Sequence, residues 1–176
     1  GLVGRSTKDI KITNCWFDGR LTHTGNSLSD RRCGGLVGFV ISNGIINNCL
    51  NTGLIEASKY TTPNPNNQSI IVPLAGGLVG NVYKDVSFTI SDSINIGNIK
   101  VNDVATAGFG SVIGFSDGKV SIKNTYALNE SCKFHAVSNS IGGEVAAFDK
   151  SKLKGYGAYQ WTLLDFDKYW AVTMAD

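Results

Sequence analysis

The chain has 176 residues, of which 42% are hydrophobic and 17% are charged, and its formal net charge is +2. This composition excludes an intrinsically disordered chain, because disorder requires low hydrophobicity combined with high net charge. The basic residues form no stripe, and the longest apolar runs fall far short of the roughly 20 residues of a membrane span. We therefore expect no nucleic-acid partner and no direct insertion into a membrane.

The chain begins with a tetrapeptide, G-L-V-G, that returns along the sequence. Its copies start at residues 1, 35, 77, 111 and 143, where the fourth reads S-V-I-G and the fifth reads G-E-V-A. Successive copies are thus 34, 42, 34 and 32 residues apart, a period typical of repeat architectures. Because the first copy opens at residue 1, we also expect the chain to be a fragment of a longer polypeptide.

Two further markers follow the tetrapeptide in a fixed phase. The first marker is an Asn or Asp and occurs at Asn14, Asn48, Asp92 and Asn124. The second marker lies five residues later and occurs at Gly19, Gly53, Gly97 and Asn129. Glycine, and asparagine more than other residues, adopts positive φ. The second marker therefore predicts a turn with positive φ in every copy.

Apolar and polar residues alternate between these markers, which is typical of strands. In the second copy we expect strands over residues 36–41, 45–50 and 54–57. Three strands and three corners in each copy of about 34 residues predict an all-β fold: a right-handed parallel β-helix (β-solenoid) of about four to five coils, whose equivalent residues stack about 4.8 Å apart. A β-propeller is the alternative, but its blades need four strands and a closed ring.

In such a solenoid the first markers would stack as a side-chain ladder at one corner. A ladder of this kind satisfies polar groups that a bend otherwise leaves without partners. The cysteines are Cys15, Cys33, Cys49 and Cys132, with no C-x-x-C pair. Since Cys15 and Cys49 occupy equivalent positions, they would also stack. The cysteines are either buried free thiols or partly paired in disulfides.

Two segments depart from the repeat. The stretch 60–69 lies in a proline-containing insertion before the third copy, and we expect a protruding loop that either forms a binding face or is a passive connection. Residues 1–148 are expected to form the solenoid. The aromatic-rich residues 149–176 are expected to cap its last coil, with a platform for stacking sugars as the alternative.

The G-L-V-G tetrapeptides with the following N-C and G spacing resemble the GLUG-motif repeat family over residues 1 to about 148. The closing segment F-D-K-Y-W at 166–170 is similar to the aromatic segment that often follows the last such repeat. Members of that family are large secreted or surface-attached proteins, including adhesin-like proteins and regions flanking IgA-type metallopeptidases. The resemblance implies an extracellular or cell-surface module without catalytic residues. The fourth copy departs from the pattern at Ser111 and Ile113.

The sequence shows no residue pattern that is typical of a catalytic, metal or cofactor site. The two histidines, His23 and His135, lie far apart without paired carboxylates, so neither a metallopeptidase nor a zinc site is expected. No cofactor and no metal are expected either. Two N-x-S sequons, at Asn67 and Asn129, could carry glycans if the source is eukaryotic.

These observations favour a non-enzymatic extracellular structural or adhesion module, which acts as a rigid spacer or binding segment of a surface protein. Its partner would be a protein or a glycan. A filament protomer that stacks end to end through an open N-terminal coil is one alternative. A carbohydrate-active β-helix lyase or hydrolase is another, although such enzymes need a carboxylate cluster on one face.

Overall fold

The computed structural model describes residues 1–23, 32–58, 60–61, 70–71, 73–102, 108–128, 142–148 and 162–171. The regular structure in these ranges is all β, and every strand pair is parallel except one. This confirms the all-β, parallel part of the sequence prediction. No helix with the length and apolar character of a membrane span occurs in the described part of the chain.

Residues 32–58 show one complete passage of the chain in five short strands, the first of which precedes the G-L-V-G tetrapeptide and is counted here with the copy that follows it. They are β5 (Arg32–Gly34), β6 (Val37–Val40), β7 (Gly44–Asn47), β8 (Leu50–Asn51) and β9 (Leu54–Ser58). The third copy repeats the path with β12 (Leu74–Gly76), β13 (Val79–Val82), β14 (Ser87–Ser91), β15 (Ile94–Asn95) and β16 (Ile99–Asn102).

The first and fourth copies follow parts of the same path. The first has β1 (Val3–Ser6), β2 (Ile10–Thr13), β3 (Trp16–Phe17) and β4 (Arg20–His23). The fourth has β17 (Phe109–Gly110), β18 (Ile113–Ser116) and β19 (Lys119–Leu128), and β20 (Gly142–Phe148) belongs to the fifth.

The expectation of three strands per copy is therefore wrong. Asn48 has a φ of 52° and divides the predicted strand 45–50 into β7 and β8. The strand β5 has only three residues, too few to show an alternating pattern.

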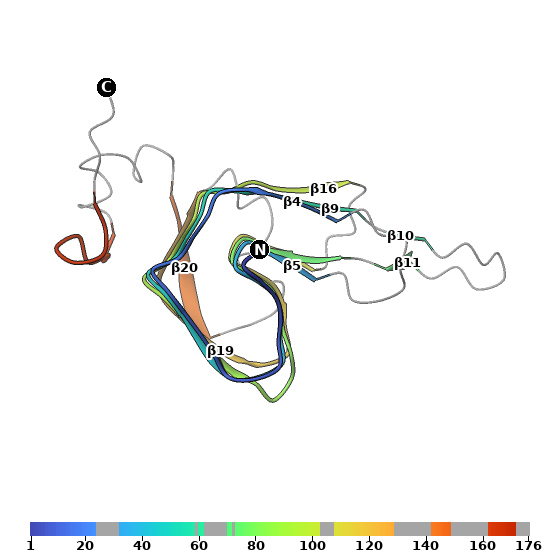
Figure 1. Cartoon of the computed structure of the whole chain (residues 1–176), viewed down its shortest axis with the longest axis horizontal. Coiled ribbons are helices and arrows are strands. Elements are labelled where there is room, and N and C mark those ends of the chain that lie inside the picture. The colour runs from blue at the N-terminus through green and yellow to red at the C-terminus, as the bar shows by residue number, and fades with distance from the viewer. Residues whose placement is uncertain are drawn as a thin grey trace, which may run out of the picture.

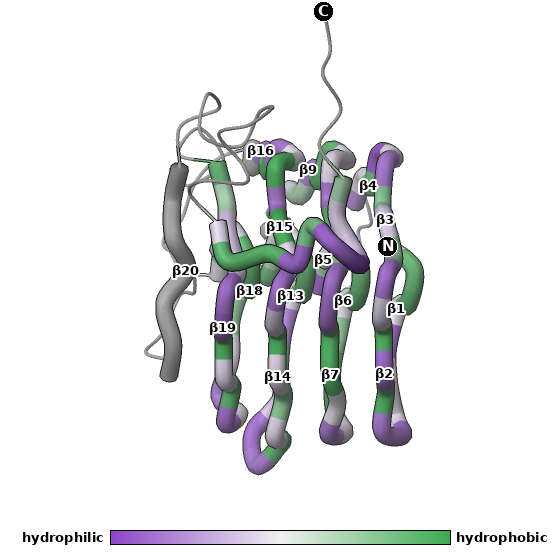
Figure 2. The backbone as a smooth tube through the Cα atoms, turned by 90° about the vertical axis from the view of Figure 1, so that its left-hand side faces the viewer, coloured by the Kyte–Doolittle hydropathy of each residue, from purple (hydrophilic) through white to green (hydrophobic). Residues whose placement is uncertain are grey.

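Equivalent strands of successive copies pair side by side, so each position of the repeat forms a column (Figure 1). Three of the sheets have the orders β1-β6-β13-β18, β5-β12-β17 and β4-β9-β16. The largest sheet has eight strands, because the long β19 pairs with β14 through its first half and with β15 through its second half. Viewed from the side, β2, β7, β14 and β19 follow one another in that order (Figure 2).

The G-L-V-G tetrapeptide lies where the chain reverses sharply between β5 and β6, and between β12 and β13. In the third copy its second glycine, Gly80, packs against the backbones of β5 and β6 of the preceding copy. A Cβ atom at Gly80 would lie 2.5 Å from the carbonyl oxygen of Gly38 and 2.7 Å from the amide nitrogen of Cys33. No side chain fits between backbones at this separation, which accounts for the glycine.

The columns enclose two apolar cores. The larger core lies between the β1-β6-β13-β18 sheet and the eight-stranded sheet, and it includes the fully buried Leu36, Ile46, Leu78 and Ile90. The smaller core lies between the β5-β12-β17 and β4-β9-β16 sheets and contains Cys33, Ile55, Ala57, Ala75 and Phe109. In it, Cys33 is 4% exposed and acts as a small apolar side chain.

The insertion before the third copy contains the one antiparallel pair. The strands β10 (Tyr60–Thr61) and β11 (Ile70–Ile71) pair Tyr60 with Ile71 and Thr61 with Ile70. Most of the loop expected over residues 60–69, including the sequon at Asn67, lies outside the described residues.

The close approach at the second glycine of the tetrapeptide can be tested with a matched pair of substitutions. We expect Gly80→Ala to lower the free energy of unfolding by about 1–3 kcal/mol, because the new methyl group overlaps two backbones. The control is Gly4→Ala at the equivalent position of the first copy, where a Cβ atom would meet nothing within 4 Å, so its effect should stay within about 0.5 kcal/mol. Urea denaturation of both variants measures the difference, and equal effects would contradict this account.

Candidate functional site

The first markers lie at equivalent corners with left-handed backbone. The φ angles are 55° at Asn14, 52° at Asn48, 50° at Asp92 and 43° at Asn124. Asparagine and aspartate tolerate this region better than other non-glycine residues, because their short polar side chains bond locally. The positive φ expected at the second markers therefore occurs at the first markers instead.

The side chains at this corner form hydrogen bonds along the stack. Asn124 Nδ2 donates to Asp92 Oδ1 at 3.0 Å. Asn47 Nδ2 donates to Asp92 Oδ2 at 2.9 Å, and Asn48 Nδ2 donates to Asn47 Oδ1 at 2.7 Å. The connection between the second and third copies thus runs through Asn47, the residue before the marker.

The residue after each first marker is a small hydrogen-bond donor. Cys15 Sγ, Cys49 Sγ, Ser93 Oγ and Thr125 Oγ1 each donate to the carbonyl oxygen two residues earlier, at 3.3, 3.2, 2.7 and 2.8 Å. Thiol and hydroxyl groups therefore have the same structural role at this corner.

Cys15, Cys33 and Cys49 are free thiols, whereas Cys132 lies outside the described residues. Burial raises the pKa of Cys49 to about 11, so its thiol stays protonated and remains a donor at neutral pH. Because the pKa is raised, this contribution to stability is lost only as the pH rises toward that value.

A second Asn ladder, which sequence reasoning missed, lies inside the molecule. Asn51 and Asn95 are both fully buried, and Asn51 Nδ2 donates to Asn95 Oδ1 at 2.7 Å. Asn95 Nδ2 in turn donates to the carbonyl oxygen of Ser111 at 2.7 Å. The same Oδ1 atoms accept the backbone N–H of Gly53, at 3.0 Å, and of Gly97, at 3.1 Å.

Close packing explains two of the second markers. Positive φ is absent at Gly19, Gly53 and Gly97, which lie within the described ranges. At Gly53 a Cβ atom would overlap the carbonyl oxygen of Gly19 and lie 2.6 Å from the ring of Phe17, and at Gly97 it would overlap the carbonyl oxygen of Gly53 and lie 2.7 Å from Asn51 Nδ2. Close packing, not backbone conformation, therefore requires glycine at Gly53 and Gly97. The fourth second marker, Asn129, lies outside the described residues.

The buried Asn ladder also explains the first glycine of the tetrapeptide. A Cβ atom at Gly35 would lie 2.8 Å from Asn51 Cγ, and one at Gly77 would overlap the Asn95 amide. In the fourth copy the position equivalent to Asn95 is Ala127. The smaller side chain leaves space, and the tetrapeptide there begins with Ser111 instead of glycine. The S-V-I-G departure is thus matched by a second change 16 residues later.

An outward column of apolar side chains receives the C-terminal segment 162–171. The column consists of Trp16, Leu50, Ile94 and Tyr126, which pair in register. Leu164, Phe166 and Trp170 pack on this column, and the Leu163 N–H donates to Tyr126 Oη at 2.7 Å. A periodic signal in the sequence could have revealed the column, since each member lies two residues after a first marker.

The described part of the predicted cap therefore lies across the side of the stacked copies (Figure 2). It contacts Tyr126 of the fourth copy at one end, and at the other its Tyr169 lies beside Asn14 and Asn48 of the first two copies. The apolar outward column decides this placement, because it offers the segment an area to bury. We call residues 162–171 the strap.

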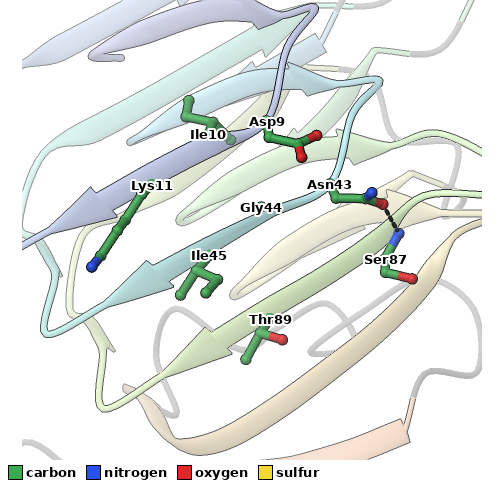
Figure 3. Close-up of a pocket in the computed structure, with 8 residues that line it drawn as sticks. All are labelled: Asp9, Ile10, Lys11, Asn43, Gly44, Ile45, Ser87 and Thr89. Carbon is green, nitrogen blue, oxygen red and sulfur yellow. Dashed lines mark hydrogen bonds between the residues drawn. The ribbon is translucent and has the colours of Figure 1, made fainter.

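An elongated trough lies on the outer face of β2, β7 and β14, and Tyr169 of the strap lines one of its halves. One half of the trough, of about 400 Å³, is lined by Asp9, Ile10, Lys11, Asn43, Gly44, Ile45, Ser87 and Thr89 (Figure 3). The other half, of about 350 Å³, is lined by Lys11, Thr13, Asn14, Ile45, Asn47, Asn48 and Tyr169. Lys11 and Ile45 line both halves, so the two depressions adjoin at these side chains.

Strand pairing fixes the floor of the trough. Lys11, Ile45 and Thr89 are register partners on three adjacent strands and lie side by side (Figure 3). At one end of the floor, the backbone N–H of Ser87 donates to Asn43 Oδ1 at 2.9 Å. Among the lining side chains, Ile45 is 44% exposed and Tyr169 is 43% exposed, so both present apolar surface to a ligand.

A tight turn in the strap holds Tyr169. The carbonyl oxygen of Asp165 accepts the N–H groups of Tyr169 and Trp170, each at 3.0 Å, and Asp165 Oδ1 accepts the N–H of Lys168 at 3.1 Å. The ammonium of Lys168 lies 4.8 Å from the centre of the Tyr169 ring. The hydrogen bond between the Lys168 and Tyr169 side chains raises the pKa of Lys168.

Away from the trough, an ion pair connects two successive copies. Arg20 bonds Glu56 through Nη2 at 2.6 Å, which joins the first two copies. The hydrogen bond from Arg20 lowers the pKa of Glu56. In the described ranges, no three His, Cys, Asp or Glu side chains are grouped so that they could hold a metal ion. His23 lies at the end of β4, and His135 falls outside the described residues.

Comparisons of the chain with protein-family models, with curated proteins and with solved structures found no match.

The buried Asn ladder gives a testable prediction. Asn95→Ala should lower the free energy of unfolding by about 2–4 kcal/mol, because it leaves the Asn51 Nδ2 amide and the Ser111 carbonyl buried without their Asn95 partner. The Gly97 N–H loses its bond to Asn95 Oδ1 but keeps its bond to the carbonyl oxygen of Asn51. Asn98→Ala is the control, since Asn98 is exposed, and its effect should stay within about 0.5 kcal/mol. Thermal and urea unfolding of both variants measure the loss in free energy of unfolding. Equal losses for Asn95→Ala and Asn98→Ala would contradict a stabilising role of the buried Asn ladder.

Proposed function

We propose that the chain is a rigid structural or adhesion module of an extracellular or cell-surface protein, built as a right-handed parallel β-helix. The observation that carries the proposal is the in-register parallel pairing of equivalent positions in successive copies. Such pairing turns each residue of the repeat into a column and produces a stiff rod whose outer faces are regular. A rod of this kind suits a spacer or a surface that holds side chains in fixed positions.

Contacts between copies support the proposed stiffness. Backbone ladders join successive copies within each of the four parallel sheets, and the buried bond between Asn51 and Asn95 adds a side-chain connection inside. On the outside, the strap packs on Leu50, Ile94 and Tyr126, which belong to three successive copies. Bending the rod would separate these contacts, so the copies are expected to move as one body.

The proposed location follows from the sequence motif. The spacing of G-L-V-G and the following Asn resembles the GLUG-motif repeats, whose members are secreted or surface-attached. We therefore extend to this chain the compartment that the resemblance implies, together with a partner that is a protein or a glycan.

The location is tested with antibodies raised against the purified chain. Intact cells of the source organism should be labelled without permeabilisation, because the module is exposed outside the cell. An antibody against an internal protein, which should label only permeabilised cells, is the control. Labelling that requires permeabilisation would overturn the proposal.

A second candidate, a filament protomer, is favoured by the edges of the first copy. All four of its strands, β1, β2, β3 and β4, lie at the ends of their sheets. The outer sides of these strands present backbone groups for another parallel strand, and such edges are templates for association. A second copy of the chain could add its last coil there, head to tail.

Light scattering over a concentration series tests the filament candidate. A filament protomer should grow from 18.8 kDa into long, polydisperse species as the concentration rises. Introducing charge at the edge through Val3→Lys should suppress this growth. A constant mass of 18.8 kDa at every concentration would exclude the filament and leave the spacer or adhesion module.

A further inference from the structure

We infer that the trough on the outer face of β2, β7 and β14 binds an uncharged oligosaccharide. This inference rests on the proposed function and names the ligand class and the site. It is carried by the shape of the trough, by its lining chemistry, and by the way Tyr169 is fixed in its lining.

The shape of the trough suits a chain-like ligand. Two depressions of about 400 and 350 Å³ adjoin at Lys11 and Ile45 and extend from Thr89 on β14 to Asn14 and Tyr169. The lining side chains stand on the face of adjacent strands (Figure 3), so a ligand longer than the trough could continue beyond either end. The two depressions follow one another along β2 and β7, from residues 9–11 and 43–45 to residues 13–14 and 47–48. Outward side chains of one strand repeat about every 6.6 Å, which spaces the lining groups regularly along a bound polymer.

The lining combines hydrogen-bonding groups with apolar surface. Hydroxyl and amide groups of Thr13, Thr89 and Asn14 lie beside the exposed side chains of Ile45 and Tyr169. A sugar ring has hydroxyl groups around its rim and C–H groups on its faces. Its hydroxyl groups can therefore hydrogen-bond to the hydroxyl and amide groups of the lining. Its C–H face can pack on the side chains of Ile45 and Tyr169, since an aromatic ring offers an apolar face.

Other ligand classes fit the trough less well. An extended peptide recognised by strand addition needs a free sheet edge. The floor of the trough is instead the side-chain face of β7, whose backbone is bonded to β2 on one side and to β14 on the other. A peptide added to the free edge of β2 would therefore lie beside the trough and not in it. A polyanion needs a cluster of cations, whereas among the described lining residues Lys11 is the one cation, and it lies together with the carboxylate of Asp9. The near balance of charge favours an uncharged ligand.

The site is preorganised, which lowers the entropic cost of binding. Strand pairing fixes the floor, and the Asp165 turn with Lys168 fixes the ring of Tyr169. Leu164 anchors the strap, since its side chain is only 7% exposed against Ile94 and Tyr126. The binding site is thus complete only when the strap is docked.

The inference is tested by saturation-transfer NMR of the whole chain. The probes are unbranched hexasaccharides of glucose, N-acetylglucosamine, mannose and xylose. A heparin hexasaccharide is the anionic comparison. We expect binding of at least one uncharged hexasaccharide and no comparable binding of heparin. Absence of binding by all four uncharged probes, or a preference for heparin, would overturn the inference.

Matched variants locate the binding. Tyr169→Ala should weaken the affinity roughly threefold to tenfold through the lost ring contact, whereas Leu163→Ala on the same strap should not change it, because Leu163 is 76% exposed and does not line the trough. Asn14→Gly removes a lining amide but tolerates the positive φ, and Asn124→Gly is its equivalent outside the trough. Thermal unfolding checks that all four variants fold.

Binding that survives both Tyr169→Ala and Asn14→Gly would place the sugar elsewhere and overturn the assignment of the trough. These outcomes are separable from those of the antibody experiment. If the antibody labels intact cells but the chain binds no uncharged sugar, the proposed sugar site is wrong and the proposed function stands. A chain that is never exposed on intact cells contradicts the proposed function whatever it binds.

Discussion

In-register parallel pairing between copies is the constraint on which the rest of the structure depends. It places each residue beside the equivalent residue of the next copy. Each side chain must therefore pack or hydrogen-bond with the equivalent side chains of the neighbouring copies. Apolar residues satisfy this requirement by packing in columns such as Leu36 and Leu78. Polar residues satisfy it only when donors and acceptors alternate along the stack, as Asn51 and Asn95 do.

This constraint couples positions that are distant in sequence. A buried asparagine needs space, and the first glycine of the tetrapeptide provides it at Gly35 and Gly77. Where the asparagine becomes Ala127, the tetrapeptide begins with Ser111. The departure of the fourth copy from the repeat thus consists of two linked substitutions: a smaller residue at Ala127 and a larger one at Ser111.

The strap uses the same regularity on the outside. An apolar column formed by Trp16, Leu50, Ile94 and Tyr126 offers one continuous strip, and a segment lying across the copies can bury side chains along it. Because the strip is straight, the strap brings Tyr169 from the far end of the sequence beside Asn14. Tyr169 thereby lines one half of the trough.

The all-β character, the parallel stacking of copies and the repeated corners at Asn14, Asn48, Asp92 and Asn124 could be predicted from the sequence, because each of these follows from local periodicity. The positive φ was predicted at Gly53 and its equivalents, since both residue types permit that conformation and spacing alone does not choose between them. The bond between Asn51 and Asn95, the position of the strap across the side and the trough became visible only in the folded chain. Each of these depends on which residues of different copies come into contact, and contacts between copies are set by three-dimensional packing.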